Sequence, residues 1–228
     1  MTFGSLFSGI GGMDLGLERA GMECRWQVEI DPYCTKVLKR HWPNVRRFGD
    51  ITYVDPKELG TVDLIAGGFP CQDVSHAGKR VGIDGARSGL WAHQLRLVRH
   101  LRPRFVLVEN VTGLLDRGIG RVLGDLARFG YDAEWTVLSA CAFGAPHPRE
   151  RLFILAYPTS LGEGQLRRLK CSRQSAPQRD IHWAKSEPEC ERVLDGVPNR
   201  VDRLTGLGNA VVPQVAEWIG RRILEATA

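Results

Sequence analysis

Short apolar runs and amphipathic stretches alternate along the first two thirds of the chain. Six apolar or β-branched runs predict strands, at residues 2–8, 24–30, 62–66, 105–109, 135–139 and 152–156. Apolar residues at helical spacing predict helices at residues 13–20, 31–41, 90–101 and 119–129. Strands that alternate with helices and are apolar on both faces indicate an α/β fold, with a mostly parallel, doubly wound sheet covered on both sides.

The alternation stops between Pro158 and Pro198, where Arg, Ser, Gln and Pro are frequent and neither the helical nor the strand period is present. An amphipathic helix is then predicted at residues 214–226. The simplest arrangement is one α/β domain formed by residues 1–157 and 200–228, interrupted by a small module at residues 158–199.

Composition places the chain among ordinary globular proteins. With 228 residues, 43% of them hydrophobic and 25% charged, it is not collagen-like, coiled-coil or wholly disordered. It has no apolar run near the roughly 20 residues of a membrane-spanning helix and no basic signal-peptide leader, so we expect a cytoplasmic protein. The six cysteines lack framework spacing and indicate reduced thiols; we expect Cys24, Cys34 and Cys141 to be buried and structural.

A glycine-rich loop, Gly9-Ile10-Gly11-Gly12, joins the first predicted strand to the first predicted helix. Glu29 ends the next strand at a spacing that suits a carboxylate binding ribose hydroxyls, and Asp50 follows further along. The strict G-x-G-x-x-G pattern fails because residue 14 is Asp, so the loop could also be a tight turn without a ligand. An adenosine-bearing cofactor is the better interpretation, with NAD and S-adenosylmethionine both open.

Candidate reactive residues lie near the ends of three of the predicted strands. Cys71 lies in a glycine-flanked loop after residues 62–66, and Glu109 ends the buried run at 105–109. Parallel strands place such residues at one sheet edge, where burial can raise the pKa of a carboxyl group and a nearby cation can activate a thiol. Arg149 and Arg151, spaced by two before the next strand, would face the same way in extended chain.

Seven sequence blocks stand in the order shown by DNA (cytosine-5)-methyltransferases. They are F-S-G-I-G-G, V-E-I-D, G-D-I, G-G-F-P-C-Q-D-V-S, E-N-V, P-R-E-R and G-N-A-V-V-P, between Phe7 and Pro213. The chain most resembles the compact members of this family carried by bacteriophages and prophages. The resemblance implies a Rossmann-like, S-adenosylmethionine-dependent methyltransferase fold, with residues 158–199 as a short target-recognition insertion.

The resemblance also implies a cofactor site for S-adenosylmethionine. Phe7, Gly9, Ile10 and Gly11 would hold the cofactor, Glu29 its ribose and Ile30 the face of its adenine. Asp50 and Ile51 would contact the adenine edge, and Asn209 and Ala210 would close the pocket. We expect no metal, because Cys171, His182 and Cys190 are too few and too irregularly spaced for a zinc site.

For the chemistry, the resemblance implies that Cys71 attacks C6 of a cytosine and that Pro70 shapes the nucleophile loop. Glu109 would bind N3 and the exocyclic amine, and Arg151, supported by Arg149, would hold the O2 side. The target base must leave the stack, and residues 72–91, including Gln72 and Ser75, would close over double-stranded DNA.

One position departs from the family pattern, and three rival functions stay open. His147 stands where the family usually has Gln, so the contact made there is expected to differ. A tRNA cytosine methylase shares these motifs, and a catalytically silent DNA-binding relative shares the fold. An NAD-dependent oxidoreductase would leave Pro70-Cys71-Gln72 and the arginine pair unexplained. We expect a monomer that acts on DNA.

The net charge of +5 is concentrated in one segment. Residues 164–185 hold six basic residues against Asp180 alone, so this segment carries the whole formal excess. Because it lies within the predicted insertion, we expect Arg167, Arg168, Lys170 and Arg173 to contact DNA phosphates, which position DNA without specifying sequence.

Overall fold

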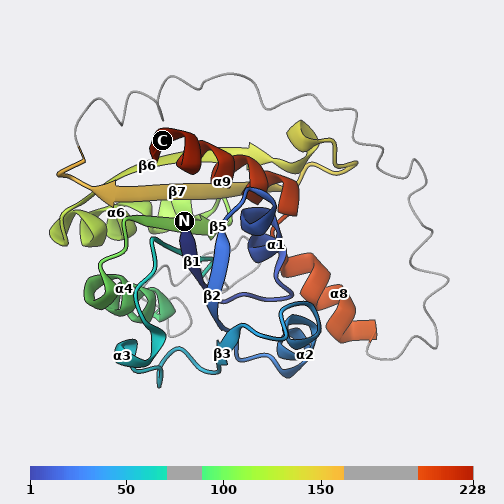
Figure 1. The fold of residues 1–228 in the computed structure, drawn as a ribbon. Helices are drawn as coiled ribbons and strands as arrows, with labels where there is room; N and C mark the ends of the chain where they lie inside the picture. The colour runs from blue at the N-terminus through green and yellow to red at the C-terminus, as the bar shows by residue number, and fades with distance from the viewer. Residues whose placement is uncertain (71–88, 162–199, 228) are drawn as a thin grey trace.

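The computed structural model describes residues 1–70, 89–161 and 200–227, and its centre is one mixed β-sheet (Figure 1). In the described part the sheet has seven strands in the order β3-β2-β1-β4-β5-β7-β6. The strands are β1 (Thr2–Leu6), β2 (Glu23–Val28), β3 (Arg46–Phe48), β4 (Leu64–Gly67), β5 (Phe105–Asn110), β6 (Tyr131–Ser139) and β7 (Glu150–Pro158). All neighbours pair in parallel except β7, which is antiparallel to β5 and β6. The predicted α/β class and mostly parallel sheet are confirmed.

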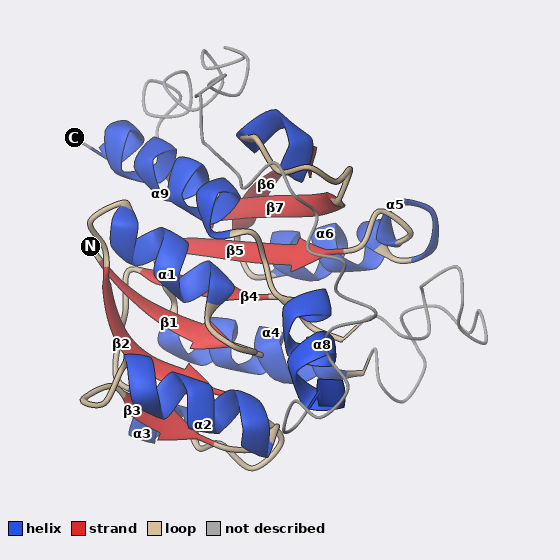
Figure 2. Cartoon of the chain, turned by 90° about the vertical axis from the view of Figure 1, so that its right-hand side faces the viewer, coloured by secondary structure: helices blue, strands red, loops and turns tan. Residues whose placement is uncertain are grey.

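Helices cover both faces of this sheet (Figure 2). They are α1 (Gly12–Arg19), α2 (Pro32–His41), α3 (Pro56–Leu59), α4 (Leu90–Leu101), α5 (Leu114–Arg117), α6 (Ile119–Arg128), α8 (Arg200–Asn209) and α9 (Pro213–Thr227), with a 3-10 turn η1 (Ala140–Phe143). One apolar core joins α4 and α6 to one face, and a second joins α1 and α9 to the other. None of the helices in the described ranges is long and apolar enough to cross a membrane.

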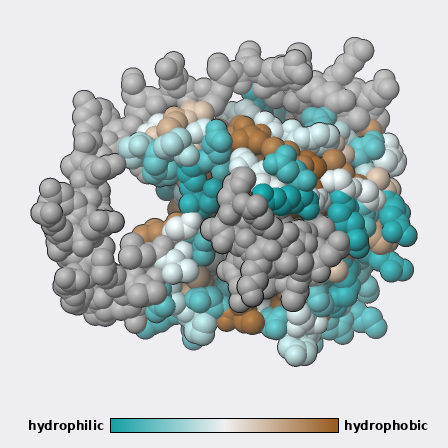
Figure 3. All heavy atoms as spheres, turned by 180° about the vertical axis from the view of Figure 1, so that it is seen from behind, coloured by the Kyte–Doolittle hydropathy of each residue, from teal (hydrophilic) through white to brown (hydrophobic). Residues whose placement is uncertain are grey.

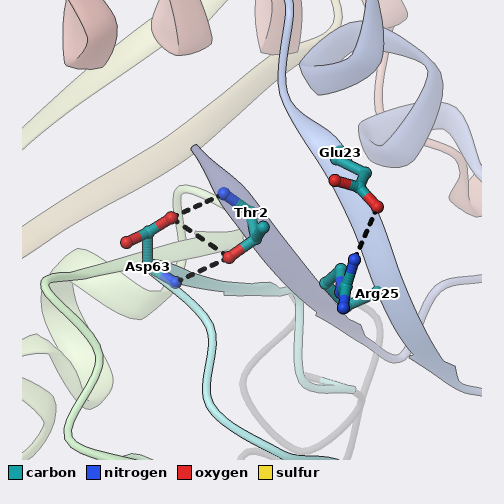
Figure 4. Close-up of polar contacts among 4 residues, drawn as sticks. All are labelled: Thr2, Glu23, Arg25 and Asp63. Atoms are coloured by element: carbon teal, nitrogen blue, oxygen red, sulfur yellow. Dashed lines mark hydrogen bonds and ion pairs between the residues drawn. The ribbon is translucent and has the colours of Figure 1, made fainter.

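Local chemistry explains where the elements begin. Asp31 precedes α2, where its side chain accepts a hydrogen bond from the Cys34 N–H at 2.8 Å, and Pro32 occupies the first helical turn. At the start of β1, the Asp63 carboxylate accepts hydrogen bonds from the backbone N–H of Thr2 at 2.6 Å and from its hydroxyl at 3.1 Å (Figure 4). These contacts lie at the amino end of the parallel strands, opposite the edge that carries the predicted chemistry.

The C-terminal segment packs tightly against the first helix. A Cβ atom on Gly12 would overlap the carbonyl oxygen of Val211, so this close approach requires glycine. Residue 12 opens α1 directly after the glycine loop, and Val211 directly follows Asn209 and Ala210. The packing therefore brings two residues near the C-terminus beside the loop that follows β1.

The expectation for Cys141 is wrong. Cys24 and Cys34 are buried, but Cys141 is exposed, because η1 turns Ala140 and Phe143 into the core and leaves the residue after Ala140 on the surface.

Hydrophilic and hydrophobic side chains of the described residues are interspersed on the face shown in Figure 3. The domain division predicted at residues 158–199 falls largely outside the described residues and stays a prediction.

Candidate active site

The glycine loop after β1 has an unusual backbone. Phe7 has φ 53°, in the left-handed region that non-glycine residues rarely adopt, and Gly9 follows with φ 56°. Holding Phe7 in this conformation costs on the order of 1–2 kcal/mol. Such backbone strain is concentrated at functional sites. The loop lies at the carboxyl end of β1, where the Phe7 side chain is partly buried against the core.

Glu29 is fixed by hydrogen bonds from the backbone on both sides of its carboxylate. Its Oε2 accepts from the Gly9 N–H at 2.6 Å, and its Oε1 accepts from the Asp31 N–H at 2.8 Å. Each carboxylate oxygen can accept a further hydrogen bond, so both remain able to receive hydroxyl groups of a ligand. Glu29 thus joins the loop after β1 to the end of β2 and retains free acceptor capacity.

A cavity of about 730 Å³ is lined by residues at the carboxyl ends of β1, β2, β4 and β5 and by residues of α8. Figure 2 shows that α8 lies at this edge of the sheet. The size of the cavity is typical of a pocket for a small molecule or cofactor. The sequence-predicted residues that line it are Phe7, Gly9, Glu29, Ile30, Asp50, Ile51, Pro70, Glu109, Arg151, Asn209 and Ala210. Ile10, Gly11 and Arg149 are not among its lining residues.

The wall near β2 and β3 is partly apolar. The Ile30 side chain is 68% exposed although it lines the cavity, so it offers an uncovered apolar surface to a flat ring. The neighbouring turn after β3 is closed by Asp50, whose Oδ1 accepts from the Thr52 N–H at 2.9 Å. Ile51, buried to 3% exposure, also lines the cavity. This part of the cavity suits an apolar ring that carries polar edges.

The opposite end of the cavity holds a buried ion pair. Glu109, at 9% exposure, has its Oε1 3.1 Å from the Arg151 Nε. Burial raises the pKa of the Glu109 carboxyl group, and this effect outweighs the lowering by the Arg151 and Arg149 guanidinium groups. Glu109 can therefore hold a proton at a pH where an exposed glutamate has lost it, while Arg151 keeps its carboxyl group in place.

The chain that leads to Cys71 is anchored from β5. The Asn110 Nδ2 donates to the Phe69 carbonyl at 3.2 Å, and the Phe69 ring packs against Trp91 with ring centroids 5.5 Å apart. Pro70, which follows Phe69, lines the cavity beside Glu109. Cys71 lies outside the described residues, as do Gln72, Ser75, Arg167, Arg168, Lys170 and Arg173.

Arg149 and Arg151 take different partners, although they are spaced by two. Arg149 precedes β7, and its Nη1 donates to the Gly208 carbonyl at 2.5 Å. This hydrogen bond links the start of β7 to the last turn of α8, next to Asn209. The buried Nε and Nη2 of Arg149 have no hydrogen-bond partner among the described residues. Burial, followed by repulsion from Arg151, lowers its pKa. His147 is exposed beside it.

Sequence patterns missed several cavity residues. Asp202 and Thr205 lie on α8, which was not predicted because Gly206 and Gly208 weaken the helical pattern. Leu90 lines the cavity from the start of α4, a helix whose position was predicted correctly. Cys34 also lines it, and burial together with nearby carboxylates raises the pKa of its thiol to about 12, which disfavours the thiolate form that reacts.

Comparison with known proteins assigns the family. The model of the C-5 cytosine-specific DNA methylase family matches residues 1–200. This chain belongs to that family. Type II methyltransferase M2.BsuMI of Bacillus subtilis is 39% identical over 206 residues, which are 87% of this chain and 48% of the relative. Type II methyltransferase M.Eco47II of Escherichia coli is 40% identical over 167 residues, 70% of this chain and 40% of the relative. The chain thus spans half or less of the length of these relatives.

Solved structures agree with this fold. A protein encoded within an Escherichia coli prophage aligns with a TM-score of 0.60 and 30% identity, covering 71% of this chain and 47% of that one. The Schizosaccharomyces pombe Dnmt2 methyltransferase aligns with a TM-score of 0.62 and 24% identity, covering 78% of this chain and 57% of that one, a likeness of fold alone.

Proposed function

We propose that this methylase transfers a methyl group from S-adenosylmethionine to C5 of a flipped-out cytosine in duplex DNA, as a compact enzyme of the prophage type. One observation carries the proposal: the buried Glu109, paired with Arg151, shares a cavity with Glu29 and the uncovered Ile30. A carboxyl group and a guanidinium at one end match a pyrimidine, and an apolar wall with a carboxylate at the other matches adenosine.

The cavity fits the cofactor in size and chemistry. Glu29 would accept hydrogen bonds from the ribose hydroxyls, because its two oxygens are aimed by the Gly9 and Asp31 N–H groups and retain acceptor capacity. Ile30 would cover one face of the adenine, and Asp50 its edge. Phe7 and Asn209 would hold the remainder of the molecule. When bound, S-adenosylmethionine supplies an electrophilic methyl group attached to a sulfonium.

Glu109 and Arg151 would prepare the ring of the base. The protonated Glu109 carboxyl group would hydrogen-bond N3 and shift its proton there as the ring gains electrons, and Arg151 would hold O2. This assignment uses the raised pKa of Glu109 directly, since an ionised carboxylate has no proton to share. Burial at 9% exposure excludes water that would otherwise weaken both contacts.

Cys71 would supply the nucleophile. Its thiolate sulfur would form a bond to C6 as the C5–C6 double-bond electrons move into the ring, which would make C5 nucleophilic. The C5–methyl bond would form as the bond from the methyl group to the sulfonium sulfur breaks, so that the cofactor leaves as the neutral thioether S-adenosylhomocysteine. Loss of the C5 proton to solvent would then restore the double bond and expel the thiolate. A base inside the duplex cannot be attacked in this way, so the cytosine must be flipped out, at a cost of a few kcal/mol.

The DNA contacts in the proposal lie outside the described residues. Gln72 and Ser75 would contact the DNA around the flipped base. Arg167, Arg168, Lys170 and Arg173 would bind phosphates from a target-recognition insertion at residues 158–199. Their support is the local excess of positive charge and the position of this segment between β7 and α8.

Tritium transfer from labelled S-adenosylmethionine tests the function. We expect label in duplex DNA and none in tRNA, loss of transfer in Cys71→Ser, and normal transfer in Cys141→Ser, which changes an exposed cysteine. Label in tRNA instead of DNA would support the tRNA methylase. Tight DNA binding without transfer to either nucleic acid would show a catalytically silent relative.

A further inference from the structure

Arg96, on α4, crosses to the turn after β3. Its Nη1 donates to the Val54 carbonyl at 3.0 Å and its Nη2 donates to the Ile51 carbonyl at 2.9 Å. The two carbonyls lie more than 40 residues earlier in the chain. The planar guanidinium presents its donors in a fixed fork, so one side chain sets the spacing of both carbonyls.

The turn that Arg96 holds forms a wall of the cavity. Gly49, Asp50, Ile51 and Thr52 all line it, whereas Arg96 does not. Within the turn, the Tyr53 N–H donates to the Asp50 carbonyl at 3.1 Å, and Ile51 and Val54 are buried. These internal contacts shape the turn, but the hydrogen bonds from Arg96 tie it to α4 and satisfy two of its carbonyls, which would be left without partners if the guanidinium were removed.

The same helix contacts two other parts of the cavity. Leu90, in the first turn of α4, lines it, and Trp91 packs against Phe69 with ring centroids 5.5 Å apart. Phe69 precedes Pro70, which lines the cavity near Glu109. A displacement of the turn relative to α4 therefore changes the width of the cavity between Ile51 and Leu90.

We propose that Arg96 is a positioning residue for the adenosine half of the cofactor: through the Ile51 and Val54 carbonyls it fixes the wall formed by residues 49–52. This inference rests on the proposed cofactor. It predicts that removal of the guanidinium weakens the binding of every ligand that contains adenosine by the same factor. The rate of the methyl-transfer step should be unchanged.

Calorimetric titration with adenosine, S-adenosylhomocysteine and S-adenosylmethionine tests it. In Arg96→Met, the loss of two charged hydrogen bonds should weaken the binding of all three ligands about 10-fold. The KM for S-adenosylmethionine should rise by the same factor at unchanged kcat, and Arg96→Lys should lose less. Arg99→Met is the matched control, because it removes another guanidinium from α4. The Arg99 guanidinium lies over the Phe129 ring, 5.6 Å from the ring centroid. The affinities of Arg99→Met for the three ligands should equal those of the wild type.

Unchanged affinities in Arg96→Met, with or without a lower melting temperature, would overturn the inference, and so would a fall in kcat alone. Should that variant not fold, Arg96→Lys carries the test with the same two criteria. Wild-type protein that binds the three ligands but transfers no methyl group would overturn the proposed function alone. Wild-type protein that binds none of them would overturn both.

Discussion

Asp14 is a fully buried carboxyl group beneath the glycine loop, and replacing it with Asn should change how stability depends on pH. Its Oδ2 accepts from the Ser5 hydroxyl at 2.9 Å and its Oδ1 accepts from the Gln27 amide at 2.8 Å. Burial nevertheless raises the pKa of Asp14 from 3.8 to about 6, because it disfavours the charged form more than these hydrogen bonds favour it.

The sign and magnitude follow from proton linkage. Between pH 3.8 and about 6 the folded protein holds a proton on Asp14 that the unfolded chain has lost, so this group makes stability fall as pH rises. At 1.36 kcal/mol per pKa unit, the full difference is about 3 kcal/mol. This loss of stability is complete above pH 6 and absent below pH 3.8, the ordinary pKa of the Asp14 carboxyl group in the unfolded chain.

Urea unfolding of wild type and Asp14→Asn from pH 4 to pH 8, at constant ionic strength, measures this difference. Asn does not titrate, so the stability of the variant relative to wild type should rise by about 2.4 kcal/mol between pH 4 and pH 7, because a small part of the full difference is already present at pH 4. A constant offset from altered hydrogen bonds would not alter that slope. Glu225→Gln, which removes a carboxylate that is 65% exposed, is the control for the loss of one negative charge at the surface. Parallel curves for Asp14→Asn would refute the reasoning.

Three further predictions concern the site and its supports. Glu109→Gln should lower kcat by about 10²-fold or more, because Gln cannot give a proton to N3, and a binding titration should show unchanged cofactor affinity. A near-normal kcat would contradict the role assigned to Glu109. Gly12→Ala should lower the free energy of unfolding in urea by about 1–3 kcal/mol and weaken cofactor binding, because the new Cβ displaces Val211. A variant with wild-type stability and cofactor affinity would show that the overlap is easily relieved. Changing Arg167, Arg168 and Arg173 to Gln should weaken DNA binding and reduce its salt dependence by up to one unit of slope for each phosphate that the variant no longer binds, and an unchanged slope would place the phosphate-binding residues elsewhere.

Much of the fold was predictable because its central strands are mostly apolar and buried. The run that forms β5 is buried along its whole length, and such a run between amphipathic helices has few other solutions than a parallel sheet. The reversed direction of β7 was not predictable, since hydrophobic periodicity is the same for both strand directions. The three-residue β3 is too short to show any period.

The candidate site was predictable in its composition but not in its contacts. The ends of β2 and β5 predicted Glu29 and Glu109, because the carboxyl ends of parallel strands meet at one edge, whereas Phe7 was expected only from the family resemblance. The pattern did not show that Arg151 pairs with Glu109 while Arg149 reaches Gly208, since the spacing of two suggested a common direction. Those contacts depend on where β7 and α8 lie relative to each other.

Covalent trapping tests the central claim most directly. Duplex DNA with 5-fluorocytosine at the target site is incubated with the protein and S-adenosylmethionine, and the products are separated under denaturing conditions. Because fluorine at C5 cannot leave as a proton does, the adduct between Cys71 and C6 should persist as a stable protein–DNA complex, which Cys71→Ser should not form. A wild-type preparation that methylates ordinary DNA but forms no such complex would contradict the account.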